Sequence, residues 1–122
     1  MAAKNLELGK WGEETALDCI TGMGWKILGV NVKVPLGELD IVAIDGRELV
    51  IIEVRTRTCG RTMPPECTVG PSKMKKLIRS GSIFVSRNCW EGPWRIDLVA
   101  ITVKDEAHWD IEHYRNITSE VF

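Results

Sequence analysis

Two apolar runs on either side of a short turn segment constrain this chain more than any other feature of its sequence. The runs are "ELDIVAI" (38–44) and "ELVIIEVRTR" (48–57), and "DGR" lies between them. An Asp-Gly pair between two alternating apolar segments is a strong local signal of a β-hairpin. We therefore predict an antiparallel pair of strands over these residues.

Periodicity predicts the other elements. Helices are expected at 5–23 and 72–87, and strands at 25–34, 94–103 and 108–117. The last strand alternates like a half-exposed edge strand. The order is helix, three strands, helix, two strands. It predicts an α/β fold in which helices pack on a mixed five-stranded sheet.

The size and composition are those of an ordinary globular protein. The chain has 122 residues, of which 44% are hydrophobic and 27% charged, enough for one domain (1–122) with a real core. No apolar run approaches the ~20 residues that span a bilayer, and the N-terminus lacks the apolar stretch of a secretory signal. These features predict a cytoplasmic protein with no membrane partner. The four cysteines lack zinc-site spacing and are expected to be reduced thiols.

The charge is polarised along the chain. The formal net charge is -1, but residues 55–89 carry +7 and the rest of the chain carries -8. Such a segment can form a face that attracts phosphate. The alternative is a solvated helix whose lysines simply face water.

The second run of the hairpin ends in charges at alternate positions. Strand geometry puts Glu53, Arg55 and Arg57 on the face that also carries Leu49 and Ile51. Charges beside a core-facing row are costly unless they are paired or functional. These residues therefore need an explanation in the folded protein.

The hairpin register decides which acids meet Glu53. If the turn residues are Asp45 and Gly46, Glu53 faces Glu38; if they are Gly46 and Arg47, it faces Asp40. Clustered carboxylates raise each other's pKa, and a divalent cation removes this penalty. The alternative is that an arginine simply neutralises Glu53.

A resemblance to a known family covers nearly the whole chain. Asp40 followed by "EVR" (53–55) resembles the Asp…(Asp/Glu)-x-Lys signature of the PD-(D/E)XK nuclease superfamily. "GKWGEETA" (9–16), the hairpin segment 37–57, "GPSKMKKL" (70–77), "RIDLVAI" (95–101) and "HYRNI" (113–117) resemble, in order, blocks of the YraN family. These small bacterial proteins are related to Holliday-junction resolvases. The resemblance implies a restriction-endonuclease-like three-layer fold.

The resemblance also implies a metal site and a substrate. Asp40, Glu53 and the carbonyl of Val54 would hold Mg²⁺ or Mn²⁺, and Glu13 would bind the same metal directly or through water. The catalytic residues would be Asp40, Glu53, Glu13 and Arg55. The chemistry would be endonucleolytic hydrolysis of phosphodiester bonds, in structured or branched DNA. By analogy with related dimeric enzymes, a homodimer is also expected. The phosphate contacts are expected from basic residues of the positive segment: Arg57, Arg61, Lys73, Lys75 and Lys76.

One position departs from the signature. Arg55 stands where the superfamily has lysine. A guanidinium cannot act as a base, but it can bind phosphate oxygens through several donors. Two interpretations therefore stay open: a metal-dependent nuclease, or a nucleic-acid- or partner-binding module with little or no catalysis. A third, an interaction protein that binds no nucleic acid, draws on the five tryptophans.

Overall fold

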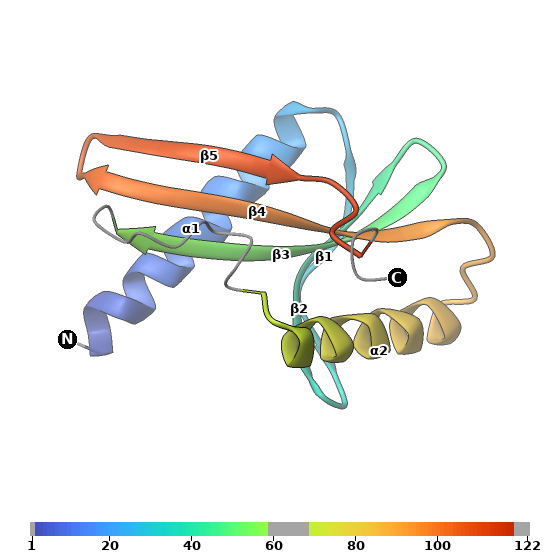
Figure 1. Cartoon of the computed structure of the whole chain (residues 1–122). Helices are drawn as coiled ribbons and strands as arrows, with labels where there is room; N and C mark the ends of the chain where they lie inside the picture. The colour runs from blue at the N-terminus through green and yellow to red at the C-terminus, as the bar shows by residue number, and fades with distance from the viewer. Residues whose placement is uncertain (1, 59–68, 119–122) are drawn as a thin grey trace.

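The computed structural model describes residues 2–58 and 69–118, with side chains described from residue 7 onward. Two helices and five strands follow the predicted order (Figure 1). Their ends lie within a few residues of the predicted ones. The elements are α1 (Ala2–Gly22), β1 (Lys26–Val34), β2 (Gly37–Asp45), β3 (Glu48–Thr58), α2 (Pro71–Arg87), β4 (Trp94–Asp105) and β5 (His108–Tyr114).

The sheet is mixed, and its strands lie in the order β1-β2-β3-β4-β5. Only β3 and β4 pair in parallel, and α2 provides the crossover between them. The two helices cover opposite faces: Ala16 and Ile20 of α1 pack on one face, and Leu77 of α2 packs on the other. The α/β prediction is confirmed, and the strand predicted at 108–117 is an edge strand that ends at Tyr114.

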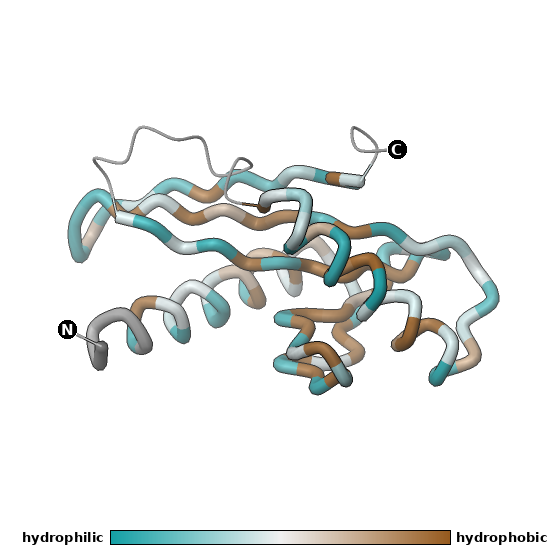
Figure 2. Tube along the Cα trace, turned by 60° about the horizontal axis from the view of Figure 1, so that its bottom comes forward, coloured by the Kyte–Doolittle hydropathy of each residue, from teal (hydrophilic) through white to brown (hydrophobic). Residues whose placement is uncertain are grey.

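Alternation along the strands builds both halves of the core. On β3, Val50 and Ile52 face α1, whereas Leu49 and Ile51 face α2. All four are buried. Figure 2 shows the hydrophobic residues gathered along the strands, while the β4–β5 turn at the left is hydrophilic. Because β3 is covered on both faces, its polar end must find partners inside the fold.

The sheet forks at one place. β2 and β3 pair from Asp45↔Glu48 only as far as Ile41↔Ile52. Beyond that point β2 stays with β1 as far as Gly37, and β3 stays with β4 as far as Thr58. Figure 1 shows β2 bending away from β3, with the first halves of both helices near the opening. The fork leaves backbone groups of both strands without a neighbouring strand.

A buried polar cluster supports β4 on the α1 side of the sheet. Asp97 is fully buried, and it accepts hydrogen bonds from Arg95 Nε (2.9 Å) and the Asn116 N–H (2.9 Å) and contacts His113 Nε2 at 2.7 Å. Burial raises the pKa of Asp97, but these hydrogen bonds outweigh it and the pKa is lowered. Asp97 therefore has the ion pair and hydrogen bonds of a structural residue.

Among the described residues, no helix combines the length and the hydropathy needed to cross a membrane.

Candidate functional site

A hollow of about 390 Å³ opens at the fork of the sheet. Both diverging strands and the first halves of both helices contribute to its wall. All five residues that the sequence predicted for the metal and catalytic site line it, and so does Lys73, one of the predicted phosphate contacts. The five are Glu13, Asp40, Glu53, Val54 and Arg55. The lining residues are Leu8, Gly9, Glu13, Asp40, Glu53, Val54, Arg55, Thr56 and Lys73.

The hairpin adopts the register that brings Asp40 to Glu53. The turn residues are Gly46 and Arg47, and Gly46 has φ 62°, in the left-handed region that glycine adopts readily. One step past the last pair, Asp40 lies opposite Glu53. The Val54 N–H, which has left the ladder with β2, donates to Asp40 Oδ2 at 2.8 Å. The fork therefore fixes Asp40 beside the end of β3.

Glu53 is a buried acid with a strongly shifted pKa. Its exposed fraction is 5%. Burial raises its pKa, and the nearby Asp40 carboxylate and a hydrogen bond between the two carboxyls raise it further, to about 7, although Lys73 and Arg55 lower it. Protonation of Glu53 would relieve the repulsion between the two carboxylates. A divalent cation would relieve it in the same way.

Two positively charged side chains lie close to the same carboxylate oxygen of Glu53. Arg55 Nη2 lies 3.0 Å and Lys73 Nζ 3.7 Å from Glu53 Oε2. Among the described residues, buried Arg55 Nε has no hydrogen-bond partner. An unpaired buried donor is costly, and this one belongs to a side chain that lines the hollow. The Arg55 guanidinium at the wall of the hollow therefore keeps one donor that the described residues do not satisfy.

Glu13 reaches the site from α1. Burial and the Asp40 and Glu38 carboxylates raise the pKa of Glu13 above its ordinary value. A hydrogen bond with the Asn31 side chain opposes this rise but does not cancel it. The neighbouring Gly12 makes this approach close, because a Cβ there would overlap the Thr56 side chain on β3. The glycine before Glu13 therefore brings α1 down onto the sheet at the site.

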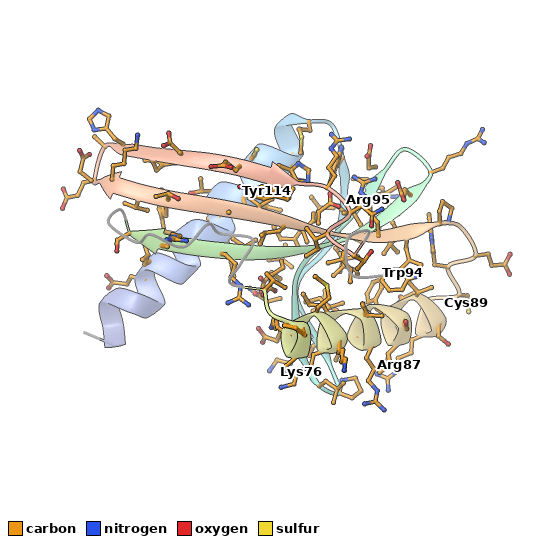
Figure 3. The ribbon with its side chains drawn as sticks, in the orientation of Figure 1. Lys76, Arg87, Cys89, Trp94, Arg95 and Tyr114 are labelled. Atoms are coloured by element: carbon orange, nitrogen blue, oxygen red, sulfur yellow. The ribbon has the colours of Figure 1, made fainter. Side chains whose placement is uncertain are left out.

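Other predicted residues lie beyond the hollow. Arg57 follows Arg55 on β3, outside the lining set. Lys75 and Lys76 are exposed on α2, and Lys76 and Arg87 point away from the sheet (Figure 3). Arg61, the remaining predicted phosphate contact, lies outside the described residues.

The sequence did not indicate every residue of the site. Leu8, Gly9 and Thr56 line the hollow without having been predicted, and Asn31 contacts Glu13 from β1. The first two precede Glu13 by about one helical turn, a signal that the helical period could have supplied. Asn31 interrupts a run of β-branched and aliphatic residues, a weaker signal. Thr56 gave none, because threonine is common in strands.

The donor set suits a hard cation. Among the described residues, no three His, Cys, Asp or Glu side chains form a ready-made metal cage. Asp40 and Glu53 offer carboxylate oxygens and Val54 a backbone carbonyl. Mg²⁺ is commonly held by one or two carboxylates while it keeps several waters. The residues present therefore fit Mg²⁺ or Mn²⁺ and are unsuited to a metal that needs thiolate or imidazole ligands.

Comparison with known proteins gives a consistent family. Residues 12–101 match the sequence model described as "Uncharacterised protein family UPF0102", also called YraN. A UPF0102 protein of Thermodesulfovibrio yellowstonii is 40% identical over 111 residues, 91% of this chain and 95% of that protein. One of Dehalococcoides mccartyi is 41% identical over 83% of this chain and 84% of its own. A UPF0102 protein of Mycolicibacterium vanbaalenii is 33% identical over 91% of this chain and 93% of its own. The chain belongs to the UPF0102 family.

Proposed function

We propose that the hollow at the fork is the site of a metal-dependent endonuclease that hydrolyses phosphodiester bonds, with structured or branched DNA as its substrate. One observation carries the proposal: Glu53 is buried beside Asp40, and two cations share its outer oxygen. The two neighbouring carboxylates favour a bound metal ion. The positively charged side chains of Arg55 and Lys73 beside them favour a phosphate. The resemblance of Asp40 and Glu53 to the two acidic positions of the nuclease signature supports the same conclusion.

Each side chain has a defined task in this proposal. Asp40, Glu53 and the Val54 carbonyl hold Mg²⁺ or Mn²⁺, with Glu13 beside them. When bound, such a cation activates water and offsets charge that develops on the phosphate. Arg55 holds Glu53 through Nη2, and its guanidinium at the wall of the hollow contacts a phosphate oxygen. Lys73, at the start of α2, contacts the neighbouring part of the phosphate.

The basic residues of α2 extend the site along the substrate. Lys75, Lys76, Arg79 and Arg87 are exposed, and no acid occurs between Pro71 and Arg87. At 1.5 Å per residue this helix is roughly 25 Å long, which is several phosphates of a nucleic acid strand. The outer face of α2 is thus a surface on which a phosphate backbone can bind.

Calorimetric titration with Mn²⁺ tests the metal site. Asp40→Asn and Glu53→Gln should each abolish binding or weaken it at least about 10-fold, because each removes a charged ligand. Glu14→Gln is the matched control: it alters the exposed neighbour of Glu13 and should bind as the wild type does. Unchanged binding in both Asp40→Asn and Glu53→Gln would contradict the assignment of the site.

Cleavage separates the proposed enzyme from the second candidate, a binding module with the same fold. Arg55 favours that candidate, because a lysine occupies its place in the nuclease signature. The wild type with Mn²⁺ should cut a four-way DNA junction, and Asp40→Asn should not. If the wild type binds Mn²⁺ and the junction without cutting, the binding module is the correct interpretation.

A further inference from the structure

Asn31 has an unusual backbone for a residue inside a strand. Its φ is 51°, in the left-handed region. Two other non-glycine residues of the described chain share this feature, Cys89 and Asn116, and each follows the end of an element. Asn31 lies in the middle of β1, where no chain end or turn accounts for the conformation. Residues held in such conformations cluster at functional sites.

The position of Asn31 links it to the acids of the fork. Its neighbours Val30 and Val32 pair with Ile41 and Leu39 of β2, so Asn31 lies opposite Asp40. Its side chain hydrogen-bonds with Glu13 on α1. Asn31 is itself exposed and is not one of the residues that line the hollow. It therefore faces one acid of the site and contacts another.

We propose that Asn31 is a positioning residue of the candidate metal site: its left-handed backbone directs its amide to α1, where it holds the Glu13 carboxylate beside Asp40. Asparagine combines the two properties that this task needs. It adopts positive φ more readily than most residues, and its amide N–H donates to a carboxylate. The proposal rests on the metal site of the proposed function and adds a residue that acts through Glu13.

A purely local role is the alternative to be excluded. An irregular backbone within an edge strand also protects the strand from pairing with other chains. β1 is such an edge, and it has a register shift between Ile27 and Gly29. In that case only the backbone of Asn31 would matter. Glycine at this position separates the two roles, because it keeps the positive φ and removes the amide.

The experiment compares Asn31→Gly, Asn31→Ala and Asn116→Gly by Mn²⁺ calorimetry and thermal unfolding. Asn116→Gly is the matched control, since Asn116 has φ 52° and lies outside the hollow. We expect Asn31→Gly to keep the melting temperature and to bind Mn²⁺ about 10-fold more weakly, as losses of a supporting hydrogen bond commonly do. Asn31→Ala should bind equally weakly and melt lower, because alanine strains this backbone. Asn116→Gly should bind as the wild type does.

A double-mutant cycle tests whether the effect passes through Glu13. In the Glu13→Gln background, Asn31→Gly should cause no further loss of Mn²⁺ affinity. Wild-type affinity in Asn31→Gly, or a loss that adds fully to that of Glu13→Gln, would overturn the inference while leaving the metal site intact. If the wild type itself binds no Mn²⁺, the proposed function fails and this inference fails with it.

Discussion

At Glu53, burial and the neighbouring Asp40 carboxylate make ionisation unfavourable in the folded protein. The unfolded chain has neither effect, so its Glu53 ionises near the ordinary value of 4.5. The folded state therefore binds one more proton than the unfolded state between about pH 4.5 and 7. A residue in this situation opposes folding whenever it is ionised, which is common where a side chain serves binding rather than stability.

The stability of the protein should consequently fall as the pH rises through this window. We expect the free energy of unfolding in the presence of a chelator to decrease between pH 5 and pH 8, by up to about 3 kcal/mol. Urea unfolding followed by tryptophan fluorescence measures it. Glu53→Gln should flatten the dependence, whereas Glu14→Gln should retain it. Equal slopes in the wild type and Glu53→Gln would show that Glu53 is not the cause.

Arg55 makes the second prediction at the scale of single residues. Its guanidinium contacts Glu53 with one nitrogen and keeps Nε unpaired among the described residues. Arg55→Ala should lower cleavage on the order of 100-fold or more, as the loss of a donor to developing charge does. It should leave Mn²⁺ affinity unchanged or higher, because a competing positive charge is gone.

Arg55→Lys is the informative comparison for that position. Lysine restores the signature of the superfamily, but one ammonium lacks the guanidinium's separate, fixed donors for Glu53 and a phosphate. We therefore expect the fold and Mn²⁺ binding to be kept and cleavage to fall. Faster cleavage in Arg55→Lys would mean that arginine performs the role of the signature lysine less effectively. Unaltered cleavage in Arg55→Ala would make Arg55 only a structural partner of Glu53.

At the scale of elements, the sequence predicted the types and order of the helices and strands because their periods are local. It left the hairpin register open between two values, and the turn at Gly46 and Arg47 decides it. The fork could not be predicted, because the sequences of β2 and β3 are each typical of one continuous strand. Their separation depends on their pairing with β1 and β4. For the same reason the sequence named Asp40 and Glu53 but missed Asn31, whose contact with Glu13 joins distant segments.

Helix α1 packs closely against β3 at Gly12, which lies next to Thr56. This close contact predicts the effect of a substitution. A Cβ at Gly12 would overlap the Thr56 side chain, so Gly12→Ala should lower the free energy of unfolding by about 1–3 kcal/mol. It should also weaken Mn²⁺ binding, because it displaces Glu13. Gly22→Ala on the same helix is the control: nothing lies within 4 Å, so stability should be unchanged or rise by up to about 1 kcal/mol.

Removal of the obstructing side chain should restore the contact. Gly12→Ala combined with Thr56→Ala should recover part of both stability and Mn²⁺ affinity relative to Gly12→Ala alone. Chemical denaturation and calorimetry of the four variants measure the coupling. Strictly additive losses would show that α1 and β3 do not meet through this pair.

For the molecule as a whole, the charge distribution matters more than the net charge of -1. Basic residues gather on α2, with Lys73 at the hollow and Lys76 and Arg87 on the outer side of the helix (Figure 3). The β4–β5 hairpin is more acidic, with Asp105, Asp110 and Glu112. A nucleic acid would therefore be attracted to one side of an otherwise acidic molecule.

This distribution predicts a salt-dependent affinity for duplex DNA. The logarithm of the binding constant should fall by roughly 0.9 per logarithmic unit of salt for each phosphate contact. Replacing Lys75 and Lys76 together by alanine should reduce that slope by up to about 2. The matched control replaces Lys26 and Lys104, which lie on other elements, and should keep it. Fluorescence anisotropy at several salt concentrations measures the slope, and equal slopes in both double variants would contradict the α2 surface.

The hydrogen bond from the Val54 N–H to Asp40 crosses the fork, which gives the site a built-in reporter. Ladder amides exchange with solvent when strands separate, but this one depends on a single carboxylate. Its deuterium uptake should therefore record how often the two branches part. Asp40→Ala should speed exchange at Val54 and leave Val50, deeper in the paired region, protected. A cation held by Asp40 and Glu53 would keep the two branches together, so deuterium uptake at Val54 would also report its binding.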